Sequence, residues 1–478
     1  MKFYKDRSTG VRPESASEVK ETLAVSSLAC VVLVILSWPA FKYFFLGEAF
    51  GYVQSYNLHG RHLFQAAFSN QGGIFFRPGF FLSEIWWHFV LPPVPMIYHL
   101  RNLVFVCLNI FLLHRVLLKF VKSRPARVIA LGLFSVSKIH LTVIGRIAVY
   151  EDAILLLFIL LSVLFWFRYI EARRFADYWL ALIFCICSVY SKDHGLVLSG
   201  VLAAILGAIA LKPGLSLFER RSWLIRFTPF VLISISNLVL RYILTGPINP
   251  NQEAYSPRFS LSVLAWQSKG FIASIGNFSL TRVQSMGARG LSGLLAEDST
   301  AVELTLCVGL WLLIFFTVWQ ARSCWRVLIV PLVWIGLYLS PILLIRNHNI
   351  WYYQEPVVGM ALLIGLCLAQ AKRALVATWS VVVVLIAING FVSNRRSDYD
   401  WQGAANQAEA IVKSIMKSQA GTRPKSIVFV TTPGSLDYWD VVVGGAMVPE
   451  ILRSPETTVD IVTDERRIPP GGLVYHLP

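Results

Sequence analysis

The sequence has unusually few charged residues. Asp, Glu, Lys and Arg make up only 15% of its 478 residues, whereas a soluble domain carries about a quarter. Hydrophobic residues account for 56%, and the mean hydropathy is +0.60. Because too few polar side chains remain to cover a water-facing surface, the composition excludes an ordinary soluble protein.

Cysteines are also scarce, and none falls in a long loop or in the C-terminal tail. The seven lie in predicted membrane spans or, for Cys324, at the edge of one; they are Cys30, Cys107, Cys185, Cys187, Cys307, Cys324 and Cys367. We therefore expect no disulfides and no cysteine metal site. The first apolar run, Leu23 to Phe45, lacks a small-residue cleavage site, so it is predicted to be a retained span and not a signal peptide.

Apolar runs long enough to cross about 30 Å of hydrocarbon recur along most of the chain. They are continuous rather than alternating, which predicts helices and not the strands of a membrane barrel. The expected fold is an α-helical polytopic membrane protein with eleven spans. Their approximate ranges are 23–45, 97–118, 128–147, 152–168, 177–190, 195–211, 227–244, 301–320, 327–345, 356–371 and 374–391.

The net charge of +16 is concentrated in the apolar part of the chain, because residues 392–478 carry a net charge of −1. Its basic clusters recur at alternate span ends, which the positive-inside rule assigns to the cytoplasm. Residues 1–22 are then cytoplasmic, the membrane domain is 23–391, and loops 46–96 and 246–300 lie outside. The membrane would be a cell's inner or plasma membrane, or the endoplasmic reticulum in a eukaryote. No nucleic-acid partner is expected.

The composition changes after Gly390, where charges of both signs appear. The pattern predicts a helix at 402–418, a strand at 427–430, a helix near 436–453 and strands at 459–463 and 473–476. Residues 392–478 are therefore expected to form a small α/β domain outside the membrane. No internal repeat is visible, which weighs against transporter folds built from duplicated halves.

Several short motifs occur in a characteristic order, and the topology places them on the outer face. They are Leu46-Gly47-Glu48, Arg77-Pro78, Tyr98 to Leu103 with Leu108-Asn109, Tyr150-Glu151-Asp152, Ser191-Lys192-Asp193, and Arg346 to Tyr353 before Glu355-Pro356. In this order, residues 23–371 resemble the GT-C superfamily of polytopic glycosyltransferases. Those enzymes use polyprenyl-phosphate-linked sugars, as the protein O-mannosyltransferases do.

The resemblance implies an inverting transfer of a sugar from a polyprenyl-phosphate donor to an acceptor on the non-cytoplasmic face. Glu48 occupies the place of the family's catalytic base, which takes the acceptor's proton. Relatives carry a second acid where this chain has Ala49. The site is therefore either a variant active site or one that has lost its activity. Glu84, Glu151 and Asp152 are the next outer acids to consider.

Lys192, Arg346 and Arg77 are the candidates for binding the donor phosphate. Lys192 stands between two apolar runs, where a charge marks a functional site by default, although an ion pair with Asp152 or Asp193 would explain it too. Arg346 is unusual because basic residues are rare on the outer face. A guanidinium can bind a phosphate through two parallel hydrogen bonds. Arg77 has a structural alternative, since Arg-Pro can simply set the turn into a helix. The remaining expected pocket residues are Asp152, Asp193, His348, Tyr352 and Tyr353.

The proposed chemistry needs no metal and no soluble nucleotide, so no cofactor is expected. His140 and His194 have no second ligand at helical spacing, which favours buried, hydrogen-bonded histidines. The sequon Asn277-Phe278-Ser279 carries little weight, because such triplets are common by chance. Two other functions stay open at this point: a lipid or solute transporter, and a catalytically silent GT-C-like scaffold.

Overall fold

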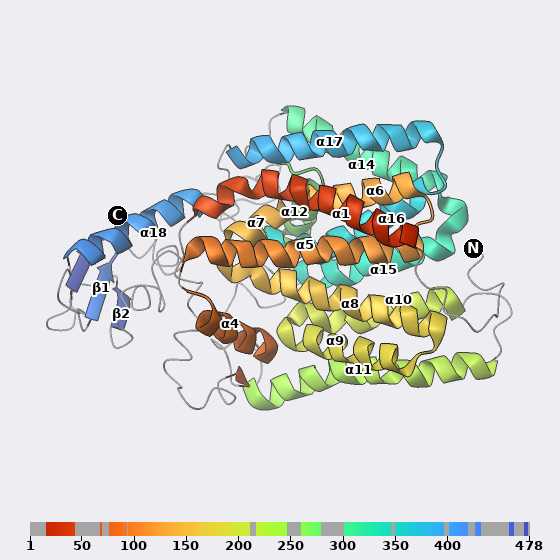
Figure 1. Cartoon of the computed structure of the whole chain (residues 1–478), viewed down its shortest axis with the longest axis horizontal. Coiled ribbons are helices and arrows are strands. Elements are labelled where there is room, and N and C mark those ends of the chain that lie inside the picture. Colours follow the sequence, from red (N-terminus) through yellow and green to blue (C-terminus); the bar gives the residue numbers. More distant parts are fainter. Residues whose placement is uncertain are drawn as a thin grey trace.

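The computed structural model is a long bundle of helices with a small sheet at one end (Figure 1). It describes residues 16–43, 67–68, 76–92, 94–210, 217–245, 260–278, 301–345, 349–395, 401–418, 426–431, 458–462 and 473–476. The bundle contains α1 (Ala16–Ser37), η1 (Trp38–Lys42), α5 (Pro95–Phe120), α6 (Arg124–Ser135), α7 (Ile139–Gly145), η4 (Ile147–Val149), α8 (Tyr150–Ala172), α9 (Phe175–Ser191), η5 (Asp193–Val197), α10 (Leu198–Ala210), α11 (Leu217–Thr245), α14 (Ala301–Gln320), η7 (Arg322–Cys324), α15 (Trp325–Ile342), η8 (Ile350–Tyr353), α16 (Gln354–Leu368) and α17 (Arg373–Arg395).

Each of the eleven predicted spans coincides with helical structure, but not all of them have the length of a full span. Within the described residues, seven helices are long and apolar enough to cross a membrane. The pair α6 and α7 meets the same test jointly, with a bend of 47° between them. The three remaining apolar segments, at Phe175–Ser191, Asp193–Ala208 and Thr305–Gln320, are shorter. The chain is thus a helical, multi-pass membrane protein, and the count of eleven crossings stays a prediction.

The bend between α6 and α7 is held by Asn277, which follows α12 (Leu261–Ile275). Its side-chain amide donates to the carbonyl of Val136, and its side-chain oxygen accepts from the backbone N–H of Lys138, both at 2.7 Å. A broken helix inside a membrane needs such partners for its freed backbone groups. Asn277 is fully buried, so its sequon is closed to glycosylation in the folded chain.

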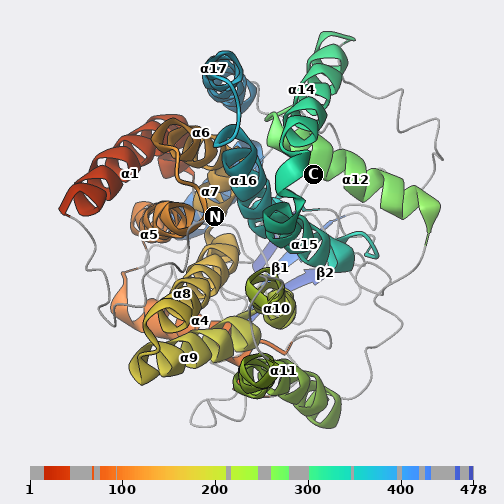
Figure 2. The same ribbon diagram turned by 90° about the vertical axis from the view of Figure 1, so that its right-hand side faces the viewer.

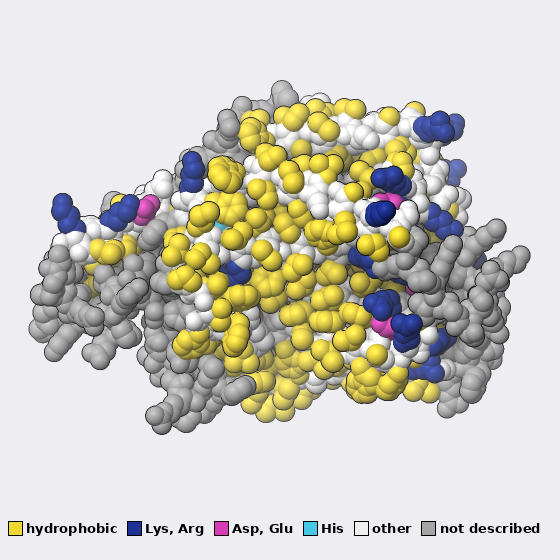
Figure 3. All heavy atoms as spheres, in the orientation of Figure 1, with side chains coloured by type: hydrophobic (Ala, Val, Ile, Leu, Met, Phe, Trp, Pro, Cys, Tyr) yellow, Lys and Arg dark blue, Asp and Glu magenta, His cyan; other side chains and the backbone are white. Residues whose placement is uncertain are grey.

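One helix, α16, forms the centre of the bundle, since every residue of its span-length window is buried. Large side chains pack nearby, among them Trp334 and Phe134, both 0% exposed. The helices α11, α14 and α17 lie at the periphery (Figure 2), and they expose large apolar side chains. The face of the bundle seen in Figure 3 is mostly hydrophobic. An apolar core and an apolar surface together are what a helix bundle in lipid requires.

The two ends of the bundle differ in charge. Lys and Arg side chains gather at the end where α1 begins (Figure 3), and we call this the basic end. The helix junctions there carry Lys119, Arg124, Arg168, Arg174, Arg226, Arg322, Arg326, Lys372 and Arg373. The C-terminal helix α18 (Trp401–Ser418) and the sheet lie beyond the opposite end (Figure 1). This placement agrees with an odd number of crossings.

The predicted loops and tail contain regular structure. Loop 46–96 contributes α4 (Pro78–Val90), which buries Phe81 and Ile85 and exposes Trp86 and Phe89. Loop 246–300 contains α12, a helix that the sequence reasoning missed. In the tail, β1 (Ser426–Val430) pairs in parallel with β2 (Thr458–Val462) and β3 (Leu473–His476), in the order β2-β1-β3. The three strands match the predicted ones; the helix expected near 436–453 lies outside the described residues.

The two charged ends predict a topology that reporter fusions can measure. An alkaline phosphatase fused after Pro478 is expected to be active, and one fused after Ser123, at the basic end, is expected to be inactive, because the positive-inside rule predicts that the basic end faces the cytoplasm. A green fluorescent protein at the same two positions should give the reverse pattern. An inactive phosphatase at the C-terminus would mean that the span count of eleven is wrong.

Candidate functional site

Charged side chains gather inside the bundle at the end opposite the basic end. They come from segments far apart in the sequence, and each stands at or near the end of a helix. The members of this ion-pair cluster are Arg77, Glu151, Asp152, Lys192, Asp193, His194, Arg241 and Glu355. Asp152 and Glu355 are fully buried, and Lys192 is 1% exposed. Charges at this depth are costly unless they are paired, and they mark functional sites in membrane proteins.

Lys192 lies at the centre of the cluster. Its Nζ donates to Asp152 Oδ1 at 2.5 Å and lies 3.0 Å from Glu151 Oε1. Burial lowers the pKa of Lys192, but the carboxylates of Asp152 and Glu151 outweigh this effect, so the pKa lies above its usual value. Lys192 is therefore a permanent cation that neutralises the two acids of the first turn of α8.

The backbone after α9 is shaped to bring Lys192 to this position. Lys192 is extended, with φ of −159°, and it separates α9 from the short helix η5. A Cβ on Gly195 would lie 2.2 Å from the carbonyl oxygen of Ser188, so only glycine allows η5 to fold back this closely on α9. Lys192, Asp193 and His194 thus face the start of α8 from one tight turn.

A chain of ion pairs extends from Lys192 across the end of the bundle. Arg77 Nη1 lies 2.9 Å from Glu151 Oε2, and its Nη2 lies 3.4 Å from Asp193 Oδ2. Asp193 also accepts from Arg241 Nη1 at 2.9 Å. The pairs tie the start of α4 and the end of α11 to the turn between α9 and η5. Each cation stabilises two segments of the chain at once.

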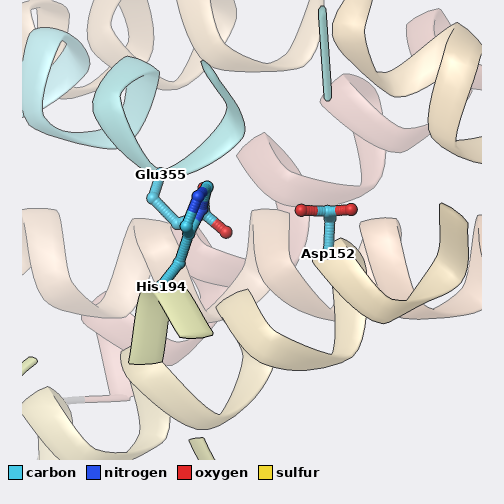
Figure 4. Close-up of side chains that lie close together, drawn as sticks. All are labelled: Asp152, His194 and Glu355. Carbon is cyan, nitrogen blue, oxygen red and sulfur yellow. The ribbon is translucent and has the colours of Figure 1, made fainter. Parts of the chain in front are cut away.

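Glu355 is the member of the cluster with the fewest partners. Among the described residues, neither of its carboxylate oxygens has a hydrogen bond, and only His194 Nδ1, at 3.7 Å from Oε2, lies within ion-pair distance. Asp152 Oδ2 and His194 Nδ1 also lack hydrogen-bond partners. One ligand atom from each of these three residues lies within 4.8 Å of the other two (Figure 4). These are the groups in the described chain that could hold a metal ion.

Five residues that the sequence analysis singled out meet in the cluster: Arg77, Glu151, Asp152, Lys192 and Asp193. The Lys192–Asp152 contact is the ion pair that was considered as the alternative to phosphate binding. Tyr352 lies alongside, with its ring centre 5.2 Å from Lys192 Nζ and 5.5 Å from the His194 ring.

Tyr353 has its hydrogen-bond partner outside the cluster. Tyr353 donates its hydroxyl hydrogen bond to Gln267 at 2.9 Å and so ties α12 to η8. Glu48, Arg346 and His348 lie outside the described residues.

Glu84, one of the alternative acids, belongs to a separate buried pair. Arg101 Nη1 lies 3.3 Å from Glu84 Oε2, and its guanidinium stacks 3.7 Å from the centre of the Tyr150 ring. Burial raises the pKa of Glu84, and Arg101 opposes that rise. The pair attaches α4 to α5 beside the cluster, which is a structural task.

Three members of the cluster were not predicted from the sequence as site residues. Arg241 was included in a predicted span, where an arginine near the end is ordinary. Glu355 was quoted within a motif but given no role. Both His140 and His194 were expected to be hydrogen-bonded. The expectation holds for His140, whose Nε2 hydrogen-bonds with the carbonyl of Phe134 at 2.9 Å. It does not hold for Nδ1 of His194, which has no hydrogen-bond partner among the described residues. A charge inside an apolar run was the signal that could have found Glu355.

Comparisons with known proteins leave the family open. No protein-family model matches the chain, and no curated protein matches it. Among solved structures, it is similar to an oligosaccharyltransferase of Archaeoglobus fulgidus crystallised with Zn and sulfate, at 12% identity and a TM-score of 0.42. The match covers 88% of this chain and 61% of the other, so the chain spans less than two thirds of that protein. A similarity of this size establishes neither fold nor function.

Lys192→Met tests how far the cluster depends on its central cation. The change leaves two buried carboxylates without their partner, which should cost on the order of 3–5 kcal/mol and lower the melting temperature of the detergent-solubilised protein. Lys119→Met is the matched control, since Lys119 pairs with Glu171 at 2.6 Å near the surface and should contribute less than about 1 kcal/mol. Equal melting temperatures for both variants would contradict the ion-pair account.

Proposed function

We propose that the chain is a GT-C-like membrane glycosyltransferase that takes its sugar from a polyprenyl-phosphate donor. The observation that supports this most is the ion-pair cluster, because it sets buried acids and cations at one end of an apolar bundle. A lipid-linked donor reaches that end from the membrane, and a water-borne acceptor reaches it from outside. Polar groups at such a depth are retained where a ligand is handled.

The reaction is a single displacement with inversion at the anomeric carbon. The carboxylate of Glu48 takes the proton from an acceptor hydroxyl as the acceptor oxygen bonds to that carbon. The bond between the carbon and the phosphate oxygen breaks on the opposite side. Polyprenyl phosphate leaves with the bonding electrons, so the reaction needs no oxidant and no nucleotide.

The leaving phosphate gains negative charge, which cations placed beforehand stabilise. In this proposal Arg77, Lys192 and Arg346 provide them. Of the two that the structure describes, Arg77 is the better placed, because its 3.4 Å contact with Asp193 is the longest of the lysine and arginine contacts in the cluster and Asp193 has Arg241 as a second partner. A phosphate can thus replace Asp193 at Arg77 without leaving that carboxylate unpaired. Asp152, Asp193, Tyr352 and Tyr353, together with His348, would shape the surroundings.

A catalytically silent scaffold is the second candidate, and one observation favours it. The second acid that the resemblance leads one to expect is replaced by Ala49. The two functions differ in chemistry and not in fold, so they are separated by measuring turnover. The sugar could be mannose, as in the protein O-mannosyltransferases, and the acceptor a protein, a lipid or a glycan.

Purified protein incubated with radiolabelled polyprenyl-phosphate sugars and a membrane extract as the source of acceptors should release polyprenyl phosphate. Glu48→Gln keeps the shape of the side chain but removes the base, so the rate should fall about a hundredfold or more. Glu409→Gln, on the surface of α18, is the control and should leave the rate unchanged. Full activity in Glu48→Gln would remove Glu48 as the base. Wild-type protein that binds donor but never releases polyprenyl phosphate would favour the scaffold.

A further inference from the structure

Asp152, His194 and Glu355 form a compact set of buried side chains that the proposed reaction does not use. They come from the first turn of α8, from η5 and from the first turn of α16. Their ligand atoms lie within 4.8 Å of one another, and Figure 4 shows the three side chains grouped at the helix ends. Three separate segments thus bring two carboxylates and one imidazole within 4.8 Å of one another in an apolar bundle.

Each of the three residues has an unsatisfied polar atom there. Asp152 Oδ2, His194 Nδ1 and both oxygens of Glu355 have no hydrogen-bond partner among the described residues. Asp152 and Glu355 are fully buried, and His194 is 7% exposed. Leaving one such group without a partner costs about 1–3 kcal/mol, and more when the group is charged. Several unsatisfied atoms this close together indicate a missing ligand.

The balance of charge indicates that this ligand is a cation. Among the described residues, the cluster holds four carboxyl groups, from Glu151, Asp152, Asp193 and Glu355, and three permanent cations, from Arg77, Lys192 and Arg241. Counted with all four carboxyl groups ionised and a neutral imidazole, the net charge of these groups is −1. Within this described set, the ion pairs of the three cations go to Glu151, Asp152 and Asp193, so Glu355 is the carboxylate that none of them pairs with.

We propose that Asp152, His194 and Glu355 bind a divalent transition-metal ion, Zn²⁺ or Mn²⁺. An imidazole nitrogen with two carboxylate oxygens is a ligand set that these ions accept, whereas Mg²⁺ and Ca²⁺ prefer oxygen alone. The 3.7 Å between His194 Nδ1 and Glu355 Oε2 is close to the separation of about 3.4 Å expected for two ligands of a tetrahedral ion. Asp152 binds Lys192 through Oδ1, which leaves Oδ2 to the metal.

The proposal departs from the sequence-based expectation of no metal, and it stands on the structure without the proposed function. One consequence does join the two. A divalent ion changes the net charge of the cluster from −1 to +1, so the cluster would then attract a donor phosphate instead of repelling it.

Metal content is the direct test. The full-length protein is purified in detergent with an affinity tag that contains no histidine, and its metals are measured by inductively coupled plasma mass spectrometry. We expect about one Zn²⁺ or Mn²⁺ per chain, or the uptake of one after stripping with chelator and adding the ion back. Adding the ion should also raise the melting temperature by several degrees, whereas Mg²⁺ should have little effect.

Two pairs of variants separate this site from others. Glu355→Gln and His194→Gln should lose the metal and the thermal shift. Glu84→Gln and His140→Gln are matched controls, since they change a buried glutamate and a buried histidine outside the triad and should keep both. A wild-type protein with no metal and no thermal response would overturn the proposal. Metal retained in both triad variants would overturn it as well. Neither readout depends on glycosyl transfer, so inactivity of the enzyme would not affect the result.

Discussion

A charge inside an apolar helix bundle must meet an opposite charge, and this requirement determines how the helices of the chain meet at one end. Lys192 is 1% exposed and lies between Asp152 and Glu151. An ammonium without partners at that depth would cost several kcal/mol, so the turn after α9 cannot move away from the start of α8. The same constraint reaches α4 through Arg77 and α11 through Arg241. A few side chains thereby fix the relative positions of four segments.

The two ends of the bundle meet this constraint in different ways. At the basic end most lysine and arginine side chains are exposed, and water or lipid headgroups solvate them; Arg127, which pairs with Glu21, is a buried exception. At the opposite end the charges point inward, so they must be satisfied by one another. Burying a charge costs desolvation free energy, and a buried ion pair contributes little net stability. Such pairs are therefore weak evidence for a purely structural role. Their cost is better explained by a ligand that needs them.

The sequence predicted most of the helices but not the way they meet. Long apolar runs coincide with the helices of the bundle, and short segments in the tail predicted the three strands to within one residue at each end. Helix α12 was missed because Gln267 and Lys269 interrupt its apolar run, and the burial of Gln267 depends on a contact with Tyr353 far along the chain. Contacts between distant parts of the chain also explain why only part of the site was predicted. Arg77, Lys192, Asp152 and Asp193 stood out as charges in apolar surroundings, whereas the partners of His194 come from other helices and have no fixed spacing in the sequence.

The balance of charge in the cluster limits which ligands it can accept. A phosphate that approaches three cations and four carboxylates meets a net negative charge, so cations in the right place are not enough for binding. Either the phosphate displaces a carboxylate that has a second partner, as Asp193 does, or an additional positive charge enters near Glu355. The first route reuses contacts that hold the fold together, and therefore couples donor binding to the packing of α4 and α11. The second route leaves those contacts intact and satisfies Glu355, which forms no ion pair with a lysine or arginine in the described part of the chain.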